Sequence, residues 1–290
     1  KTTRIVRDHF TKDSLLTIEE YQSDDEIINQ SLKKASKVGS GKGFPDFLIS
    51  HKNQPNFIIV IECKAQTSKH SSTDFSNPKD YACDGARYYA LHLAKHFDVL
   101  AIGVSGENLK ELKVSHFLIL KDTKTFSKMF SNQLLSAESY LEGYLQSEIK
   151  QKQDYESLVK FTSELNKSLD SYKVLEANRA LLTSALLISL ENKAFKESFS
   201  QQTDPSMLAK NIALAIENEL RNSGMKKESI EQLLKSYDII SSESNLLKEK
   251  RLSNLLTVLD ENFNSFSKTN KYFDVVTQFY VEFLSYAARE

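Results

Sequence analysis

Glycine and proline, the residues that interrupt regular secondary structure, are distributed very unevenly along this chain of 290 residues. Seven of the eight glycines and three of the four prolines fall before residue 144, and only Pro205 and Gly224 follow. Because these residues punctuate short strands and turns, their scarcity permits long helices. The sequence therefore predicts a mixed domain over residues 1–135 and an all-α helical domain over residues 136–290.

The first region alternates helical and strand patterns. Ser23, followed by acidic residues and then by lysines, is typical of the N-cap of a helix over residues 23–37. Spacing of apolar residues predicts a second helix over residues 77–97. Its candidate buried residues are Tyr81, Tyr88, Leu91 and Ala94. Near-continuous apolar runs predict strands at residues 46–50, 57–64, 98–106 and 115–120. This order favours an α/β or α+β domain with a mixed central sheet.

The second region is typical of a helical bundle. The run over residues 181–190 is apolar around most of its circumference, which favours a position inside the bundle. A helix after the N-cap Asp204 has Pro205 at its first position and Gly224 at its exit. A last helix is expected over residues 270–288. Its apolar stripe comprises Phe273, Val276, Phe279, Tyr280 and Phe283.

Charge and cysteine content set limits on the class of protein. The net charge is −1, with 19 Lys+Arg against 16 Asp+Glu in residues 1–130 and 19 against 23 in the remainder. This asymmetry is compatible with a DNA-facing first region. Cys63 and Cys83 are too few for a disulfide framework or a zinc site, which favours a cytoplasmic protein. No apolar run approaches 18 residues, so no membrane span is expected. No signal peptide is visible, and the start at Lys1 is consistent with a fragment or a processed product.

Three charged residues stand at the ends of two predicted neighbouring strands. Asp46 opens the first run, and Glu62 and Lys64 close the second. Side chains two apart on a strand share a face, with Cα atoms roughly 6.6 Å apart. If the strands pair, Asp46 can approach Glu62, and two carboxylates and one ammonium meet at one end of the sheet. Charges buried there are costly unless they are paired or bind something.

Such a set of residues suits a magnesium site. A few carboxylate oxygens are typical ligands of Mg²⁺, which keeps several waters and binds phosphate oxygens. One or two such ions polarise a phosphodiester and activate water, while a lysine orients that water and offsets charge in the transition state. The alternative is an exposed salt-bridge cluster at the sheet edge. An acid two residues before a lysine occurs five times here, but only Glu62 ends a β-type run and follows a strand opened by Pro45-Asp46.

The sequence "GKGFPDFLI … FIIVIECKA" resembles the PD-(D/E)xK nuclease superfamily, and most closely the N-terminal nuclease domains of type I and type IIG restriction enzymes. The resemblance covers roughly residues 15–120. It implies a restriction-endonuclease-like fold, Asp46 and Glu62 as metal ligands, the Cys63 backbone carbonyl as a further ligand, and Lys64 as the catalytic lysine. Mn²⁺ would substitute for Mg²⁺. Relatives also carry a glutamate on the preceding helix, for which Glu26 is the candidate and Glu19 and Glu20 are alternatives.

The end of the second region is similar to the helical segment before the methyltransferase core of adenine-N6 DNA methyltransferases. The resemblance implies a nuclease and a helical connector that precede a methyltransferase domain, which would bind SAM. No "NPPY"-type motif, SAM loop or Walker motif is present in this chain. Target recognition is therefore expected elsewhere in the full protein. One nuclease site cuts one strand of double-stranded DNA, so double-strand cleavage would need a second copy or a second event.

Several other residues have weaker claims to function. Lys42, Lys69 and His70 are candidates for contacts with the DNA backbone, with solvated loop residues as the alternative. His92 and His96 have a spacing that can bind zinc, but no third ligand is evident, which favours surface histidines. Two further readings of the whole chain stay open, a repair or junction-cleaving nuclease and a non-cleaving DNA-binding or assembly module.

Overall fold

The structure, a computed structural model, describes residues 1–11, 13–264 and 274–287. The chain divides into two compact units, Lys1–Lys150 and Gln151–Glu290. This division falls after the expected boundary at residue 135, because helix α4 (Ala137–Leu145) belongs to the first unit. Tyr140 and Tyr144 of α4 are buried in a core shared with the sheet, so packing assigns this helix to the first unit.

The first unit contains a six-stranded sheet in the order β1-β2-β3-β4-β5-β6. The strands are β1 (Leu16–Glu19), β2 (Phe47–His51), β3 (Gln54–Lys64), β4 (Asp98–Ser105), β5 (Lys113–Ile119) and β6 (Ser127–Met129). Neighbouring strands are antiparallel except for β3 and β4, which are parallel. A parallel pair needs a crossover connection, and helix α3 (Ala82–Leu93) lies in that connection. The predicted α/β class and the mixed sheet are confirmed.

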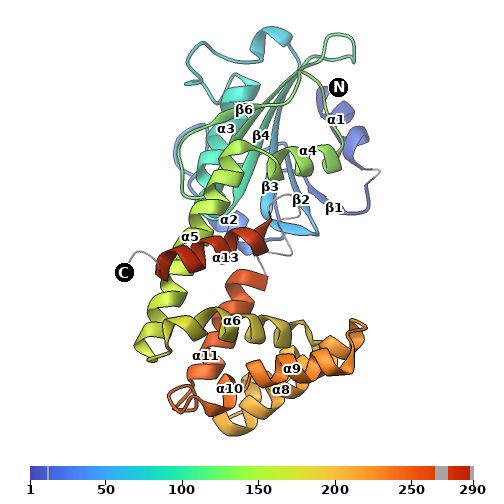
Figure 1. The fold of residues 1–290 in the computed structure, drawn as a ribbon. Coiled ribbons are helices and arrows are strands. Elements are labelled where there is room, and N and C mark those ends of the chain that lie inside the picture. The colour runs from blue at the N-terminus through green and yellow to red at the C-terminus, as the bar shows by residue number, and fades with distance from the viewer. Residues whose placement is uncertain (12, 265–273, 288–290) are drawn as a thin grey trace. The chain divides into compact units, whose positions relative to one another are not determined.

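Helices cover both faces of this sheet (Figure 1). Helix α3 and α2 (Glu26–Leu32) pack on one face, around a core that includes Leu48, Ile58 and Val60. Helix α1 (Thr2–Phe10) and α4 pack on the other face, around the intervening residues Phe47, Ile59 and Ile61. Alternate residues of β2 and β3 thus enter different cores, as expected for strands buried on both faces.

Strand β4 is buried along its whole length and carries a different polar anchor at each end. At its start, Asp98 Oδ1 accepts a hydrogen bond from the Lys121 backbone N–H (2.7 Å), and Oδ2 accepts one from the Tyr144 hydroxyl (2.6 Å). At its other end, Ser105 is paired with Lys64 of β3. The Asp98 end therefore ties the sheet to α4, while the Ser105 end lies beside the charged residues that the sequence singles out.

Helix α2 is shorter than predicted and has a different N-cap. Its cap is Asp25, whose carboxylate accepts hydrogen bonds from the backbone N–H groups of Ile27 (2.8 Å) and Ile28 (3.0 Å). Ser23 instead donates to Glu19 at 2.6 Å, and it accepts from the Asp25 N–H at 3.0 Å. The Asp25 carboxylate satisfies two amide groups of the first turn, and its charge also interacts favourably with the helix dipole.

The predicted buried face of α3 is wrong in part. Leu91 is 41% exposed and Tyr88 is half-buried, whereas Ala94 is buried as expected. The buried side is formed by Ala82, Cys83, Ala86, Tyr89, Ala90 and Leu93. Small residues allow the helix to approach β4 closely: a Cβ placed on Gly103 would lie 2.6 Å from the Cys83 Sγ. Residue size alone misled the prediction, because close packing favoured the smaller side chains.

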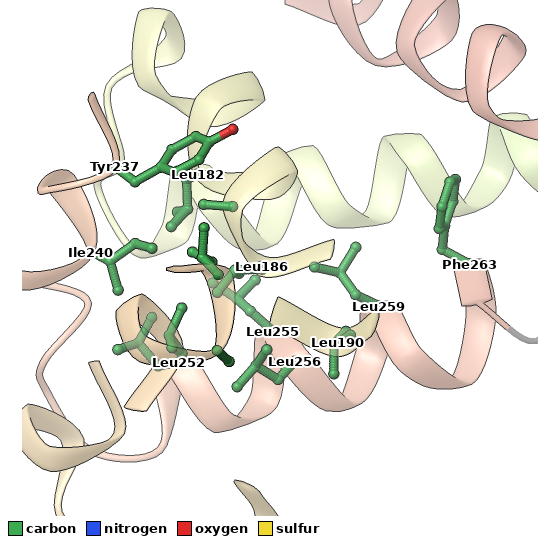
Figure 2. Packing of buried hydrophobic residues seen from close by; sticks show 14 of the residues in the cluster. Leu182, Leu186, Leu190, Tyr237, Ile240, Leu252, Leu255, Leu256, Leu259 and Phe263 are labelled. Atoms are coloured by element: carbon green, nitrogen blue, oxygen red, sulfur yellow. The ribbon is translucent and has the colours of Figure 1, made fainter. Parts of the chain in front are cut away.

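The second unit is helical throughout the part that the structure describes. Its helices are α5 (Glu148–Ser171, which begins in the first unit), α6 (Glu176–Glu191), α7 (Lys193–Ser198), η2 (Phe199–Gln201), α8 (Pro205–Asn222), α9 (Lys227–Ser236), α10 (Ile239–Ser242), α11 (Arg251–Val258), the π-helical η3 (Leu259–Asn264) and α13 (Val275–Ala287). Figure 2 shows α6 presenting Leu182, Leu186 and Leu190 to leucines of α11 in one core. None of the described helices is long and apolar enough to cross a membrane.

The predictions for two helices of this unit, α8 and α13, are partly confirmed. Asp204 caps α8 by accepting from the Ser206 N–H at 2.9 Å, with Pro205 at the first position. In α13, Phe279 and Phe283 are buried, but Val276 is 51% exposed and Val275 takes its place. The stripe was placed one residue out of phase at its start, and its first predicted member, Phe273, lies outside the described residues.

Candidate active site

The pairing of β2 with β3 brings the predicted acidic residues together. Phe47 is opposite Ile61 in the antiparallel register, so Asp46, one residue before β2, lies beside the end of β3. The Asp46 Oδ2 accepts a hydrogen bond from the Cys63 backbone N–H at 2.7 Å. Val60 faces α3, and residues two apart on a strand point to the same face, so Glu62 and Lys64 also lie on the α3 face of β3. The structure therefore places Asp46 and Glu62 at one end of the sheet, with Lys64 next along the same face.

Glu62 is buried, with 2% of its side chain exposed. Its Oε1 accepts a hydrogen bond from the Lys37 ammonium at 2.7 Å. Gly85 of α3 packs against the same side chain: a Cβ placed there would lie 3.1 Å from the Glu62 Cγ and 2.9 Å from the Pro78 carbonyl oxygen. The absence of a side chain at Gly85 makes room for the glutamate between the helix and the sheet.

Both carboxylates have a raised pKa. Burial raises the pKa of Glu62 to about 7, the negative charge of Asp46 adds to this, and Lys37 and Lys64 oppose it. Burial also raises the pKa of Asp46, against the hydrogen bond from Cys63 and the charges of Lys37 and Lys64. Burial thus makes the charged forms of both carboxylates costly despite the two nearby lysines, a condition that a further cation would relieve.

Lys64 is held by the loop that follows β3. Its ammonium donates a hydrogen bond to the Lys79 carbonyl oxygen at 2.8 Å. On the other side of the chain, the Lys64 carbonyl accepts from the Thr2 hydroxyl (3.2 Å) and from the Gly106 N–H (3.1 Å). Its backbone is therefore fixed by α1 and by the end of β4, while its charge acts on both carboxylates.

Buried polar contacts fold this loop, residues 65–81, onto the sheet. Asp84 of α3, 1% exposed, accepts hydrogen bonds from the backbone N–H groups of Ser72 (3.1 Å) and Asn77 (3.0 Å). The ring nitrogens of His70 lie 2.9 Å from the hydroxyls of Ser105 and Ser115. Burial and the charges of nearby lysines lower the pKa of His70 to about 4. His70 anchors the loop to the sheet through these contacts, and its predicted contact with the DNA backbone stays a prediction.

Glu20, rather than Glu26, is the further acid near the site. Its negative charge raises the pKa of Asp46. The Tyr21 N–H donates to the Pro45 carbonyl at 3.2 Å, which brings this segment beside Asp46, and Glu20 itself pairs with Arg7 at 2.5 Å. Glu26 is exposed in the first turn of α2, and no contact of the described residues joins it to Asp46 or Glu62. Glu20, which directly follows β1, therefore lies closer to the site than Glu26 of α2 does.

The remaining predicted residues lie apart from the carboxylates. The Lys42 ammonium donates to Asn29 Oδ1 at 2.9 Å, and the Lys69 ammonium lies 5.0 Å from the centre of the Tyr81 ring. His92 packs edge-on against Tyr88. Over the described ranges, no group of three histidine, cysteine, aspartate or glutamate residues has the arrangement of a metal site. A zinc role for His92 and His96 therefore has no support.

A divalent ion fits the residues at the end of β3. The side chains of Asp46 and Glu62 supply two hard oxygen donors, and the Cys63 carbonyl belongs to the same strand end. Mg²⁺ is commonly bound by only one or two carboxylates, with water and substrate phosphate completing the octahedron. A site with two carboxylate side chains does not need a third histidine, cysteine, aspartate or glutamate nearby. The raised pKa values of these two carboxylates at one end of the sheet are the observation that favours a cation here.

Sequence reasoning missed Lys37 and Gly85. Lys37 lies in the connection between α2 and β2, where no periodicity marks a residue as buried. A basic residue shortly before the Asp46 strand is a weak signal, since four lysines lie between residues 31 and 45. Gly85 had a stronger signal, because a glycine inside a helical pattern marks a close approach.

Comparison with known proteins gives one match over the whole chain. The chain is 27% identical over 319 aligned residues to a type II restriction enzyme and methyltransferase, RM.BcgI, of Heyndrickxia coagulans. The alignment covers 100% of this chain and 49% of that protein, so the chain spans about half the length of the curated relative. No family model matches the chain, and no solved structure matches it. The likeness supports a relation to restriction–modification enzymes.

Proposed function

We propose that this chain is the DNA-cleaving part of a bacterial restriction–modification enzyme, with a PD-(D/E)xK type of active site. The observation that carries the proposal is the pair of raised-pKa carboxylates, Asp46 and Glu62, beside Lys64 at one end of the sheet. The similarity to a restriction enzyme and methyltransferase over the whole chain supports it. The reaction is the hydrolysis of a phosphodiester bond in double-stranded DNA.

Each residue has a distinct role in this proposal. Asp46, Glu62 and the Cys63 carbonyl hold Mg²⁺, for which Mn²⁺ substitutes; when bound, the ion offsets charge on the phosphate and activates water. The Cys63 N–H fixes the Asp46 carboxylate through Oδ2. Lys64 moves its ammonium from the Lys79 carbonyl to the developing negative charge of the phosphate in the transition state. Burial of Glu62 limits access of bulk water to the strand end.

The rest of the enzyme follows from the same proposal. The helical second unit connects the nuclease to a methyltransferase domain that binds SAM, and target recognition resides elsewhere in the full protein. A second copy of the nuclease cuts the opposite strand. Such an enzyme works in the bacterial cytoplasm, where its DNA substrate is found.

Nicking of supercoiled plasmid at high protein concentration tests the proposal. The parent protein, Lys64→Ala and Lys95→Ala are incubated with Mg²⁺ or Mn²⁺, and conversion to the open circle is followed on gels. Lys95 is exposed in the turn between α3 and β4, near the Asp98 end of the sheet, and serves as the matched control. We expect metal-dependent nicking by the parent and the control, and a loss of at least a hundredfold in Lys64→Ala.

Metal binding separates an inactive fragment from an absent site. Asp46→Asn retains an oxygen acceptor for the Cys63 N–H but removes the charge, so its metal affinity is expected to fall at least tenfold in calorimetric titrations. Equal background nicking in all proteins, together with equal metal binding by the parent and Asp46→Asn, would contradict the proposal.

A further inference from the structure

Lys37 clamps one oxygen of the buried glutamate. Its ammonium lies 2.7 Å from Glu62 Oε1, with 16% of the lysine side chain and 2% of the glutamate side chain exposed. An ion pair removed from solvent to this degree is screened less by water and salt than a surface pair. The clamp comes from the loop before β2, so it does not depend on the strands that position the carboxylates.

An aromatic ring holds the clamp from its other side. The Lys37 ammonium lies 5.0 Å from the centre of the Tyr89 ring, within the range of a cation–π contact. The Tyr89 hydroxyl accepts a hydrogen bond from the Phe44 N–H at 3.1 Å. Gly43 allows this approach, because a Cβ there would lie 2.5 Å from the Tyr89 ring. The ammonium is thus fixed between a ring and a carboxylate oxygen.

The second oxygen of Glu62 is left differently. Oε2 accepts no hydrogen bond from the described residues. Among those residues, His116 Nδ1 is the one side-chain polar atom that is both fully buried and without a partner, so Glu62 Oε2 is not fully buried. Oε2 therefore keeps access to solvent, although the residue as a whole is buried. One oxygen of the carboxylate is occupied and the other is open.

We propose that Lys37 determines metal selectivity: by holding Glu62 Oε1, it makes Glu62 a one-oxygen ligand and so favours Mg²⁺ and Mn²⁺ over Ca²⁺. The inference rests on the proposed function of Asp46 and Glu62 as metal ligands. Mg²⁺ requires a near-ideal octahedron with ligands at about 2.0–2.1 Å, and Ca²⁺ takes about 6–8 oxygens at longer distance, often from a bidentate carboxylate. An ammonium in contact with Oε1 repels a cation approaching that oxygen, so two-oxygen binding is disfavoured.

The ratio of two metal affinities tests this role. Mn²⁺ alone and Ca²⁺ alone are titrated calorimetrically into the full chain at one fixed pH, for the parent, Lys37→Met, Lys37→Arg and Lys42→Met. Methionine keeps the stem against Tyr89 without the charge. Lys42 lies in the same connection but binds Asn29, so it is the matched control. Thermal unfolding establishes that each variant is folded.

The expected result is a change of at least tenfold in the affinity ratio toward Ca²⁺ in Lys37→Met. The parent ratio is retained in Lys42→Met and largely restored in Lys37→Arg, which keeps a cationic donor. A change in proton affinity of Glu62 affects both metals equally and cancels in the ratio. A merely structural lysine would lower both affinities in proportion.

The outcomes separate this inference from the proposed function. An unchanged ratio in Lys37→Met overturns the selectivity role and leaves the metal site intact. A parent protein that binds neither ion at millimolar concentration overturns the metal site itself, and the selectivity role with it. If Lys37→Met binds neither ion, the two affinities are measured in Lys37→Gln, which keeps a neutral hydrogen-bond donor. A proportionate loss of Mn²⁺ and Ca²⁺ affinity in that variant also overturns the selectivity role.

Discussion

At the scale of single residues, Glu62 shapes the pH dependence of stability. Its pKa in the folded protein is about 7, against an ordinary value of 4.5, because it is buried beside Asp46. The folded state retains the proton over this interval while the unfolded chain releases it. Stability conferred by this group is therefore present at low pH and is lost as the pH rises to about 7.

The variant Glu62→Gln removes this titration. We expect its free energy of unfolding, relative to the parent, to be greater at pH 8 than at pH 5 by on the order of 3 kcal/mol. Urea unfolding at both pH values measures the two differences, and subtraction removes the part of the substitution's effect that does not depend on pH. A relative stability that is the same at both pH values would show that the glutamate titrates normally in the folded protein.

Gly85 sets the position of the same carboxylate. In Gly85→Ala, the added methyl group meets Glu62 and the Pro78 carbonyl, which displaces the side chain. Overpacking costs roughly 1–3 kcal/mol, partly offset by the roughly 1 kcal/mol that alanine contributes in a helix. We therefore expect a shift of only a few degrees in Tm but at least a tenfold loss of Mn²⁺ affinity. Leu91→Ala, exposed on the same helix, should leave metal binding unchanged; equal affinities in the two variants would refute the prediction.

At the scale of elements, a histidine joins β5 to α4. His116 is 1% exposed, its Nε2 lies 2.7 Å from the Tyr140 hydroxyl, and burial lowers its pKa to about 4. The Leu135 N–H donates to the same hydroxyl at 3.0 Å, so the hydroxyl proton is directed toward the histidine. Below its ordinary pKa of 6.5 the unfolded chain binds a proton that the folded protein does not, and stability falls with falling pH.

Replacing this histidine should reduce the loss in free energy of unfolding that accompanies a fall in pH. Between pH 7 and pH 5 we expect the parent to lose about 2 kcal/mol more than His116→Phe, whatever the offset caused by the unpaired Tyr140 hydroxyl. Denaturant unfolding at the two pH values measures the difference. His96→Phe, at an exposed histidine, should follow the parent; the same behaviour in His116→Phe would mean that His116 titrates in the folded state.

The elements also show how far sequence alone could reach. Strong apolar runs with a turn between them were enough to place β2 and β3 and to bring Asp46 beside Glu62. The buried face of α3 could not be predicted in this way, because whether Tyr88 or Ala86 is buried depends on how closely the helix approaches β4. Lys37 was not predicted for a related reason, since its burial depends on the conformation of the loop between α2 and β2 and on the Tyr89 ring. Local patterns predict elements, and long-range packing decides which side chains they bury.

At the scale of the whole molecule, the two units have separate hydrophobic cores. The core around Leu186 is drawn from residues after 150, and the cores on the two faces of the sheet are drawn from residues before it. Residues that share a core lose their packing together when a cavity is made, whereas the other core retains its own contacts. Destabilisation should therefore remain within one unit.

Hydrogen exchange measured by mass spectrometry tests this separation. Leu186→Ala is expected to cost about 2–5 kcal/mol and to reduce protection in the second unit, while peptides of β3 and β4 keep theirs. Leu100→Ala, at an equally buried position of β4, should give the reverse pattern. Simultaneous loss of protection in both units with either variant would show that they unfold as one.

The two ends of β4 offer a practical division for protein engineering. Asp98 ties one end to α4, and Ser105 ends the strand beside Lys64 and the loop that His70 anchors. A library directed at residues around Asp98 can be selected for heat tolerance without altering the groups proposed for catalysis. A library around Ser105 and the loop can be screened for changed metal or DNA preference. One strand thus allows directed evolution to improve robustness first and then to alter chemistry.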